Sequence, residues 1–145
     1  MDAKLNYIGQ AEAIFADAQV SKSLFEAIPV PAMLIHQDRI VIAANRAALA
    51  FGVRVGSHCW EAYAKLATIP DEDRAYFEQH QKGPECGTMC VFCAADHALS
   101  GDEPISKYVE LGEQTWDAHW VPVADKVYLH FAFEVTAKKK IDLAG

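Results

Sequence analysis

The stretch Arg39-Ile40-Val41-Ile42-Ala43-Ala44-Asn45-Arg46-Ala47-Ala48 decides the fold, because it changes from strand-forming to helix-forming residues at one position. The branched apolar residues favour a strand, and Asn45 is a favoured N-terminal cap for the helix predicted over Arg46–Phe51. Another apolar run, Ala32–His36, precedes the stretch, and the pair Gln37-Asp38 separates the two runs. The sequence therefore predicts a tight hairpin that leads directly into a helix.

On the amino-terminal side, apolar residues at three- and four-residue spacing predict a helix over residues 3–19. A second short helix is predicted with Ser21 as its cap, and Pro29 and Pro31 end it. The apolar stripe of the first helix is thin and rich in alanine. It either covers the domain or pairs with the same stripe of a second copy in a dimer.

On the carboxyl-terminal side, three short helices and then three strands are predicted. The helices are expected at 58–65, from Pro70 onward and at Val91–Leu99, and the strands at 105–111, around 116–120 and at 127–135. Trp116, Ala118 and Trp120 share one face, which we expect to be core or interface. The apolar face of the last strand is expected to be Val127, Leu129, Phe131, Phe133 and Val135. His119 and His130 are expected on the opposite faces, in solvent or at a dimer contact.

Two strands, several short helices and three more strands predict an α+β fold, with a five-stranded antiparallel sheet, short helices on one face and an N-terminal helix. The 145 residues suffice for one core. We expect the N-terminal helix within 1–20, one domain over 21–137 with a cysteine-containing insertion at 59–93, and a linker at 138–145.

The net charge of -7, without a patch of Lys and Arg, argues against a nucleic-acid partner. No apolar run reaches the roughly 20 residues of a membrane span. The N-terminus lacks the pattern of a secretory signal. We therefore expect a cytoplasmic protein, in which thiols stay reduced and clustered cysteines favour metal binding or redox chemistry over structural disulfides.

Three stretches of the chain resemble PAS domains. Leu24–Met33 is similar to the opening helix, proline turn and first strand of that family, and Arg39–Ala48 to its second strand and following helix. Phe133–Lys139 is similar to its closing strand and Asp-x-Thr linker, with Glu134 in place of the aspartate. The resemblance implies a sensory, non-enzymatic role in signal transduction, as a homodimer, with a histidine kinase or other output domain in cis or trans. The asparagine–cysteine motif of flavin photosensors is missing, and no histidine is placed as a haem ligand.

All four cysteines fall between positions 59 and 93, namely Cys59, Cys86, Cys90 and Cys93. The spacing C-x3-C-x2-C lets one loop gather three sulfurs, and the fold would have to bring Cys59 to them. Clustered thiolates repel one another unless a cation or a cluster binds them. We therefore predict a shared inorganic site. His58 and His97 are candidates for an alternative ligand or for a supporting position around the site.

The identity of the centre stays open at this point. A compact trio with one remote cysteine is closer to iron–sulfur ligation, with [4Fe–4S] favoured over [2Fe–2S]. Structural zinc at the same cysteines is the alternative, with the domain then a small-ligand sensor or dimerisation module. Some oxygen-sensing kinases hold an iron–sulfur cluster in a PAS domain through four cysteines, although in two close pairs. Two segments of the chain, Cys59-Trp60-Glu61 and Cys90–Cys93, also resemble a subset of bacterial sensor PAS domains. Thiol–disulfide chemistry and inert buried cysteines are the other interpretations.

Overall fold

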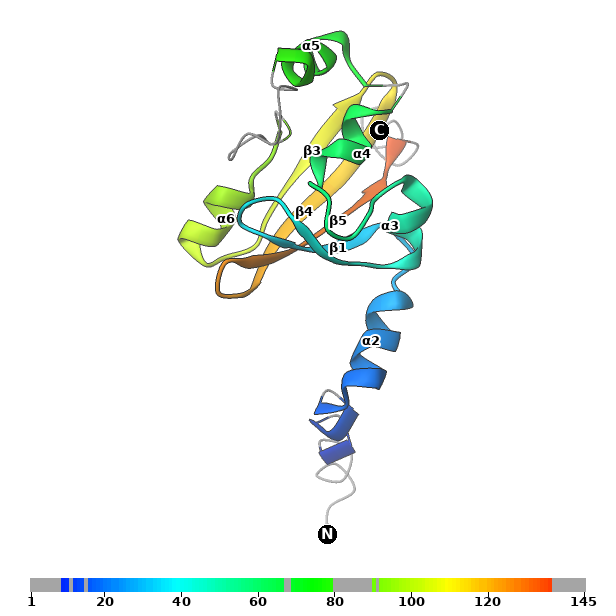
Figure 1. Cartoon of the computed structure of the whole chain (residues 1–145), viewed down its shortest axis with the longest axis vertical. Coiled ribbons are helices and arrows are strands. Elements are labelled where there is room, and N and C mark those ends of the chain that lie inside the picture. Colours follow the sequence, from blue (N-terminus) through cyan, green and yellow to red (C-terminus); the bar gives the residue numbers. More distant parts are fainter. Residues whose placement is uncertain are drawn as a thin grey trace, which may run out of the picture.

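The computed structural model describes residues 9–10, 12–14, 16–66, 69–79, 90 and 92–136. Five strands form one antiparallel sheet in the order β2-β1-β5-β4-β3, with short helices on one face (Figure 1). The predicted α+β fold is thereby confirmed. The strands are β1 (Ala32–His36), β2 (Val41–Ala44), β3 (Ile105–Leu111), β4 (Gln114–Ala124) and β5 (Val127–Glu134). The helices are α2 (Ala18–Glu26), α3 (Arg46–Phe51), α4 (Trp60–Ala64), α5 (Asp71–Gln79) and α6 (Ala95–Gly101).

Asn45 holds the predicted hairpin and helix together. Its side-chain oxygen accepts hydrogen bonds from the N–H groups of Ala32 at 3.0 Å and Ala48 at 2.9 Å. Its amide group donates to the carbonyls of Ile28 at 3.0 Å and Val30 at 2.8 Å. The side chain is 0 % exposed, so one residue joins the proline turn, β1 and α3.

The N-terminal helical region divides at Asp17, not at residue 20. Asp17 has extended backbone geometry, and its carboxylate accepts from the N–H groups of Gln19 at 2.9 Å and Val20 at 3.1 Å. The predicted cap at Ser21 is therefore wrong, because a carboxylate four positions earlier already caps α2. In Figure 1, α2 projects away from the sheet as a stalk.

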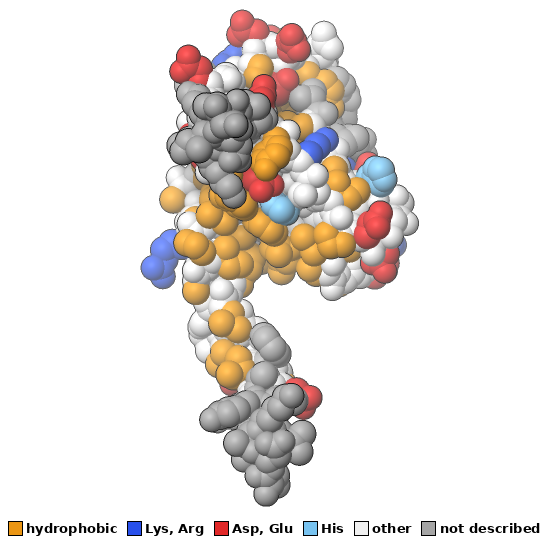
Figure 2. All heavy atoms as spheres, turned by 180° about the vertical axis from the view of Figure 1, so that it is seen from behind, with side chains coloured by type: hydrophobic (Ala, Val, Ile, Leu, Met, Phe, Trp, Pro, Cys, Tyr) orange, Lys and Arg blue, Asp and Glu red, His pale blue; other side chains and the backbone are white. Residues whose placement is uncertain are grey.

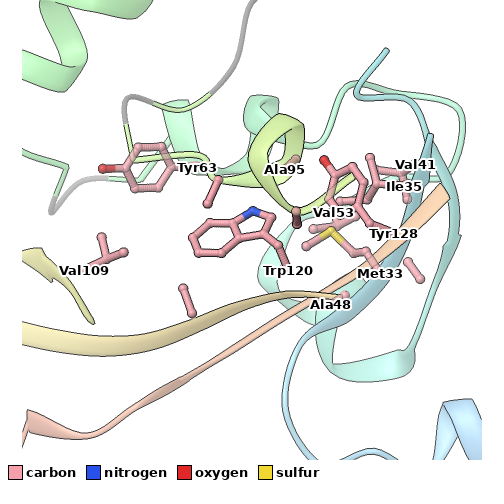
Figure 3. Close-up of a cluster of buried hydrophobic side chains, with 14 of the residues drawn as sticks. Met33, Ile35, Val41, Ala48, Val53, Tyr63, Ala95, Val109, Trp120 and Tyr128 are labelled. Carbon is pink, nitrogen blue, oxygen red and sulfur yellow. The ribbon is translucent and has the colours of Figure 1, made fainter. Parts of the chain in front are cut away.

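The core lies between the sheet and the helices (Figure 3). Trp120 of β4 is 2 % exposed and confirms the prediction that its face is buried. Trp120 pairs with His130 of β5, so His130 and the neighbouring inward residue Tyr128 share this inner face. The prediction that His130 lies on an outward face is therefore wrong. Both faces of β5 carry apolar residues, and only the pairing register decides which one turns inward.

The outer face of the sheet carries the residues that were expected to form the apolar face of β5. Phe131 stacks against His119 at 4.5 Å between ring centroids, and Phe133 lies 5.9 Å from the same ring. His119 also pairs with Asp117 at 2.8 Å. Figure 2 shows hydrophobic side chains gathered on this side of the molecule and continuing along α2. Within the described ranges, no helix has both the length and the hydrophobicity that a membrane span needs.

Candidate functional site

A cavity of about 110 Å³ lies inside the core, between the sheet and the helices. Three of the four cysteines, Cys59, Cys90 and Cys93, line it. The opposite wall consists of inward side chains of the sheet, including Trp120, Tyr128 and His130. Figure 3 shows Trp120 and Tyr128 in this space, with Tyr63 and Ala95 on the helical side. The cavity is therefore largely apolar but has a sulfur-rich section.

Cys59 reaches the cavity because the loop before α4 runs along the outer edge of β2. The N–H of Val41 donates to the carbonyl of Ser57 at 2.9 Å, and Ile40 forms an isolated bridge with His58. The N–H of Cys59 then donates to the carbonyl of Arg39 at 2.8 Å. These backbone bonds fix the start of α4 against the β1–β2 hairpin. The fold thus brings Cys59 to the cavity that Cys90 and Cys93 line, which its spacing in the sequence alone does not predict.

Cys90 and Cys93 form a turn immediately before α6, in which the N–H of Cys93 donates to the carbonyl of Cys90 at 2.9 Å. The helix begins at Ala95, so the prediction of a helix from Val91 is wrong. The turn takes the place of the first predicted helical residues and brings both cysteines to the cavity wall.

Burial and the repulsion of neighbouring thiolates dominate the electrostatics of Cys59 and Cys90. Burial raises the pKa of Cys59 to about 12, and the neighbouring Cys93 adds to the rise. Burial also raises the pKa of Cys90 well above its usual range, with further contributions from Cys59, Cys93 and Asp73. Without a cation these thiols stay protonated, and a metal would have to displace their protons. Cys59 and Cys90 are therefore poor free nucleophiles in this environment.

Two polar side chains accompany the sulfurs. The hydroxyl of Tyr128 donates a hydrogen bond to Cys59. Burial and the nearby thiols Cys59 and Cys93 raise the pKa of Tyr128, so it remains a neutral donor. The guanidinium of Arg39 lies 6.0 Å from the centre of the Tyr128 ring and pairs with Asp96 at 3.0 Å. A positive charge therefore lies beside the sulfur-rich section.

The predicted site is brought together only in part. Cys86 lies outside the described residues. His58 stacks on Trp60 at 5.3 Å and lies outside the cavity lining, and His97 is exposed on α6. Among the described residues, no group of three or more His, Cys, Asp or Glu side chains is arranged to hold a single metal ion. The four-cysteine site therefore stays a prediction.

His130 is a cavity residue that the sequence did not identify. Its Nδ1 lies 2.8 Å from the carbonyl oxygen of His119 and must carry a proton, because a carbonyl only accepts. Burial lowers the pKa of His130 to about 4, with a smaller contribution from the charge of His119. The ring is therefore neutral at physiological pH. Its cross-strand pairing with Trp120 would have revealed its position, but that register could not be read from the sequence.

Comparison with known proteins supports the fold. No protein-family model and no curated protein matches the chain. Among solved structures, the VqmA dimer of Vibrio cholerae, described as a LuxR-type receptor, has a TM-score of 0.51 at 12 % identity, covering 84 % of this chain and 53 % of that chain.

Two further structures are similar at lower scores. A sensory box sensor histidine kinase of Vibrio cholerae has a TM-score of 0.49 at 12 % identity, covering 88 % of this chain and 96 % of that chain. The PAS domain of Bordetella pertussis BvgS has a TM-score of 0.45 at 17 % identity, covering 92 % of each. At these identities the likeness concerns the fold alone.

Proposed function

We propose that this PAS-like chain is a sensory domain whose cysteine-lined cavity holds an iron–sulfur cluster through Cys59, Cys86, Cys90 and Cys93. The observation that carries the proposal is that Cys59 lines the same cavity as Cys90 and Cys93, although it lies far from them in the sequence. The described sulfurs, those of Cys59, Cys90 and Cys93, come from two segments with backbone hydrogen bonds of their own. When bound, such a cluster supplies reversible one-electron chemistry.

The size of the cavity supports a cluster over a single ion. The described cysteines line the wall of a space of about 110 Å³. A cluster distributes its ligands over several metal atoms, so it suits sulfurs that line a cavity. Zinc needs four donors around one point, and it remains the alternative centre.

The path from the site to the rest of the chain runs through α6. Cys93 stands two residues before α6, and this helix packs against β4 and β5. The oxygen of Glu134 at the end of β5 accepts from the hydroxyl of Thr136 at 2.9 Å. Oxidation or loss of the cluster would change how the Cys86–Cys93 loop is held, and with it the terminal elements. A histidine kinase or another output domain, in cis or trans, would receive this change.

We also propose that the domain functions as a homodimer through α2. This helix has no buried residue, and its Leu24 is 48 % exposed. Ile14, which precedes the helix, is 43 % exposed. A second copy of the same helix would cover this apolar surface.

The Cys59→Ser variant tests the shared site, because Cys59 is the ligand that depends on the fold. Purified without air, it should lose most of the visible absorbance of the cluster, and His97→Ala should keep it. His97 is exposed, so its loss leaves the cavity intact. A Cys59→Ser protein with unchanged iron and sulfide content would contradict the proposed ligand set.

A further inference from the structure

We propose that Arg39 is a positioning residue of the cysteine site, which joins the segments carrying Cys59 and Cys93 and supplies a fixed positive charge beside them. This inference rests on the proposed function only in requiring that the cysteines bind a metal centre of some kind. It does not depend on whether that centre contains sulfide.

The conformation of Arg39 is unusual for a turn residue. Gln37 and Asp38 at the tip of the hairpin are exposed, but Arg39 is only 3 % exposed and has a φ of 74°. Positive φ is uncommon outside glycine, and long charged side chains are seldom buried unless they are paired. Both features persist only where surrounding contacts hold the residue in place.

Those contacts join both cysteine-bearing segments. The carbonyl of Arg39 accepts from the N–H of Cys59 at 2.8 Å, at the start of α4. The guanidinium donates through Nη1 to the carbonyl of Gln37 and pairs through Nη2 with Asp96 at 3.0 Å. Asp96 belongs to the first turn of α6, three positions after Cys93. One residue thus fixes the hairpin, the Cys59 loop and the helix that follows the Cys90–Cys93 turn.

The charge of Arg39 also acts on the sulfurs. Its guanidinium pairs with Asp96 at 3.0 Å and lies 6.0 Å from the centre of the Tyr128 ring in the cavity wall. A centre held by four thiolates carries net negative charge. A buried cation beside it offsets that charge in a low-dielectric interior.

The guanidinium forms a clamp, because it bonds Gln37 and Asp96 together, and a lysine could form this clamp only in part. Its planar fork bonds the Gln37 carbonyl and Asp96 at the same time, whereas an ammonium is a compact point charge. Arg39→Lys should therefore keep the charge and lose much of the clamp, and Arg39→Met should lose both. Asp96→Asn should weaken the clamp from the exposed side and leave the buried charge in place.

Cadmium binding tests the inference without any need for a cluster. Cd²⁺ is a soft ion that thiolates bind, and the ultraviolet thiolate–cadmium absorption reports occupancy. We expect Arg39→Met to weaken Cd²⁺ binding about tenfold or more, Arg39→Lys and Asp96→Asn to weaken it less, and Arg54→Met to leave it unchanged. Arg54 is a matched control, because it is exposed and, within the part of the chain that the structure describes, its guanidinium donates to the carbonyls of Leu49 and Val53.

If the wild type holds a cluster, the reduction potential of that cluster distinguishes the effect of the Arg39 charge from the effect of its contacts with Gln37 and Asp96. Removing the cation in Arg39→Met should disfavour the added electron about tenfold, which lowers a one-electron potential by about 59 mV. Asp96→Asn should not lower it, because the cation remains. Wild-type protein that binds Cd²⁺ but no iron and sulfide would refute the cluster and leave Arg39 supported. Unchanged Cd²⁺ affinity in folded Arg39→Met and Asp96→Asn, or a wild type that binds no Cd²⁺, would overturn the role of Arg39.

Discussion

Asn45 shows how one polar residue can organise the entry to a domain. All of its hydrogen-bonding groups are used inside the protein, on four backbone partners from the proline turn, β1 and α3. Deleting the amide leaves buried donors and acceptors without partners, and each such group costs about 1–3 kcal/mol.

Asn45→Ala should therefore lower the free energy of unfolding by about 3 kcal/mol or more, measured by urea denaturation. Gln37→Ala, at the exposed hairpin tip, should change it by less than about 0.5 kcal/mol. Equal stability of the two variants would show that the Asn45 bonds do not hold the hairpin to α3.

The low pKa of His130 predicts how the stability of the fold depends on pH. Its folded pKa of about 4 lies below its ordinary value of 6.5, so the unfolded chain binds this proton more readily than the folded chain does. The contribution of neutral His130 to stability is present above pH 6.5 and is lost as the pH falls towards 4. The loss should be about 3 kcal/mol over that window, since each pKa unit corresponds to about 1.4 kcal/mol.

Urea denaturation of wild type and His130→Gln at several pH values checks this. The variant should show a flatter decline between pH 6.5 and 4, whereas His97→Ala, on the surface of α6, should follow the wild type. A decline of the same steepness in His130→Gln would mean that another group causes it.

At the scale of the elements, α2 is the one whose role depends on a partner. Leu24 of this helix is exposed, and hydrophobic side chains continue along the stalk (Figure 2). Lys22 provides an exposed polar position on the same helix. Leu24→Glu places a charge at the surface that the proposed dimer would bury.

We expect Leu24→Glu to raise the dissociation constant of the dimer about tenfold or more in analytical ultracentrifugation, and Lys22→Glu to raise it much less. A dimer that tolerates both changes equally would show that α2 is not the contact.

At the scale of the whole molecule, the sequence was most informative where local chemistry decides the structure. Asn45 marks the start of α3 in the sequence and in the structure. Thr136 is the threonine of the segment that resembles the Asp-x-Thr linker. Its hydroxyl accepts a hydrogen bond from the N–H of Thr115 at 2.9 Å, which ties the end of β5 to β4. These features are local or repeat a short motif, so single residues reveal them.

The features that could not be predicted from the sequence depend on contacts between segments that lie far apart in the chain. His130 turns inward because β5 pairs with β4 in a register that places it opposite Trp120. Arg39 would ordinarily be interpreted as a solvated turn residue, and its burial follows from the position of Asp96 on α6. Cys59 lines the same cavity as Cys90 and Cys93 because of the fold, and the spacing of the cysteines in the sequence does not reveal this.

The metal and sulfide content of the wild-type protein, purified without air, tests the central claim most directly. The account predicts a brown protein with iron and acid-labile sulfide in equal amounts, and loss of both in Cys59→Ser. One zinc per chain without sulfide would replace the cluster with structural zinc at the same cysteines. A colourless protein with neither metal would contradict the account and leave the cysteines as buried thiols.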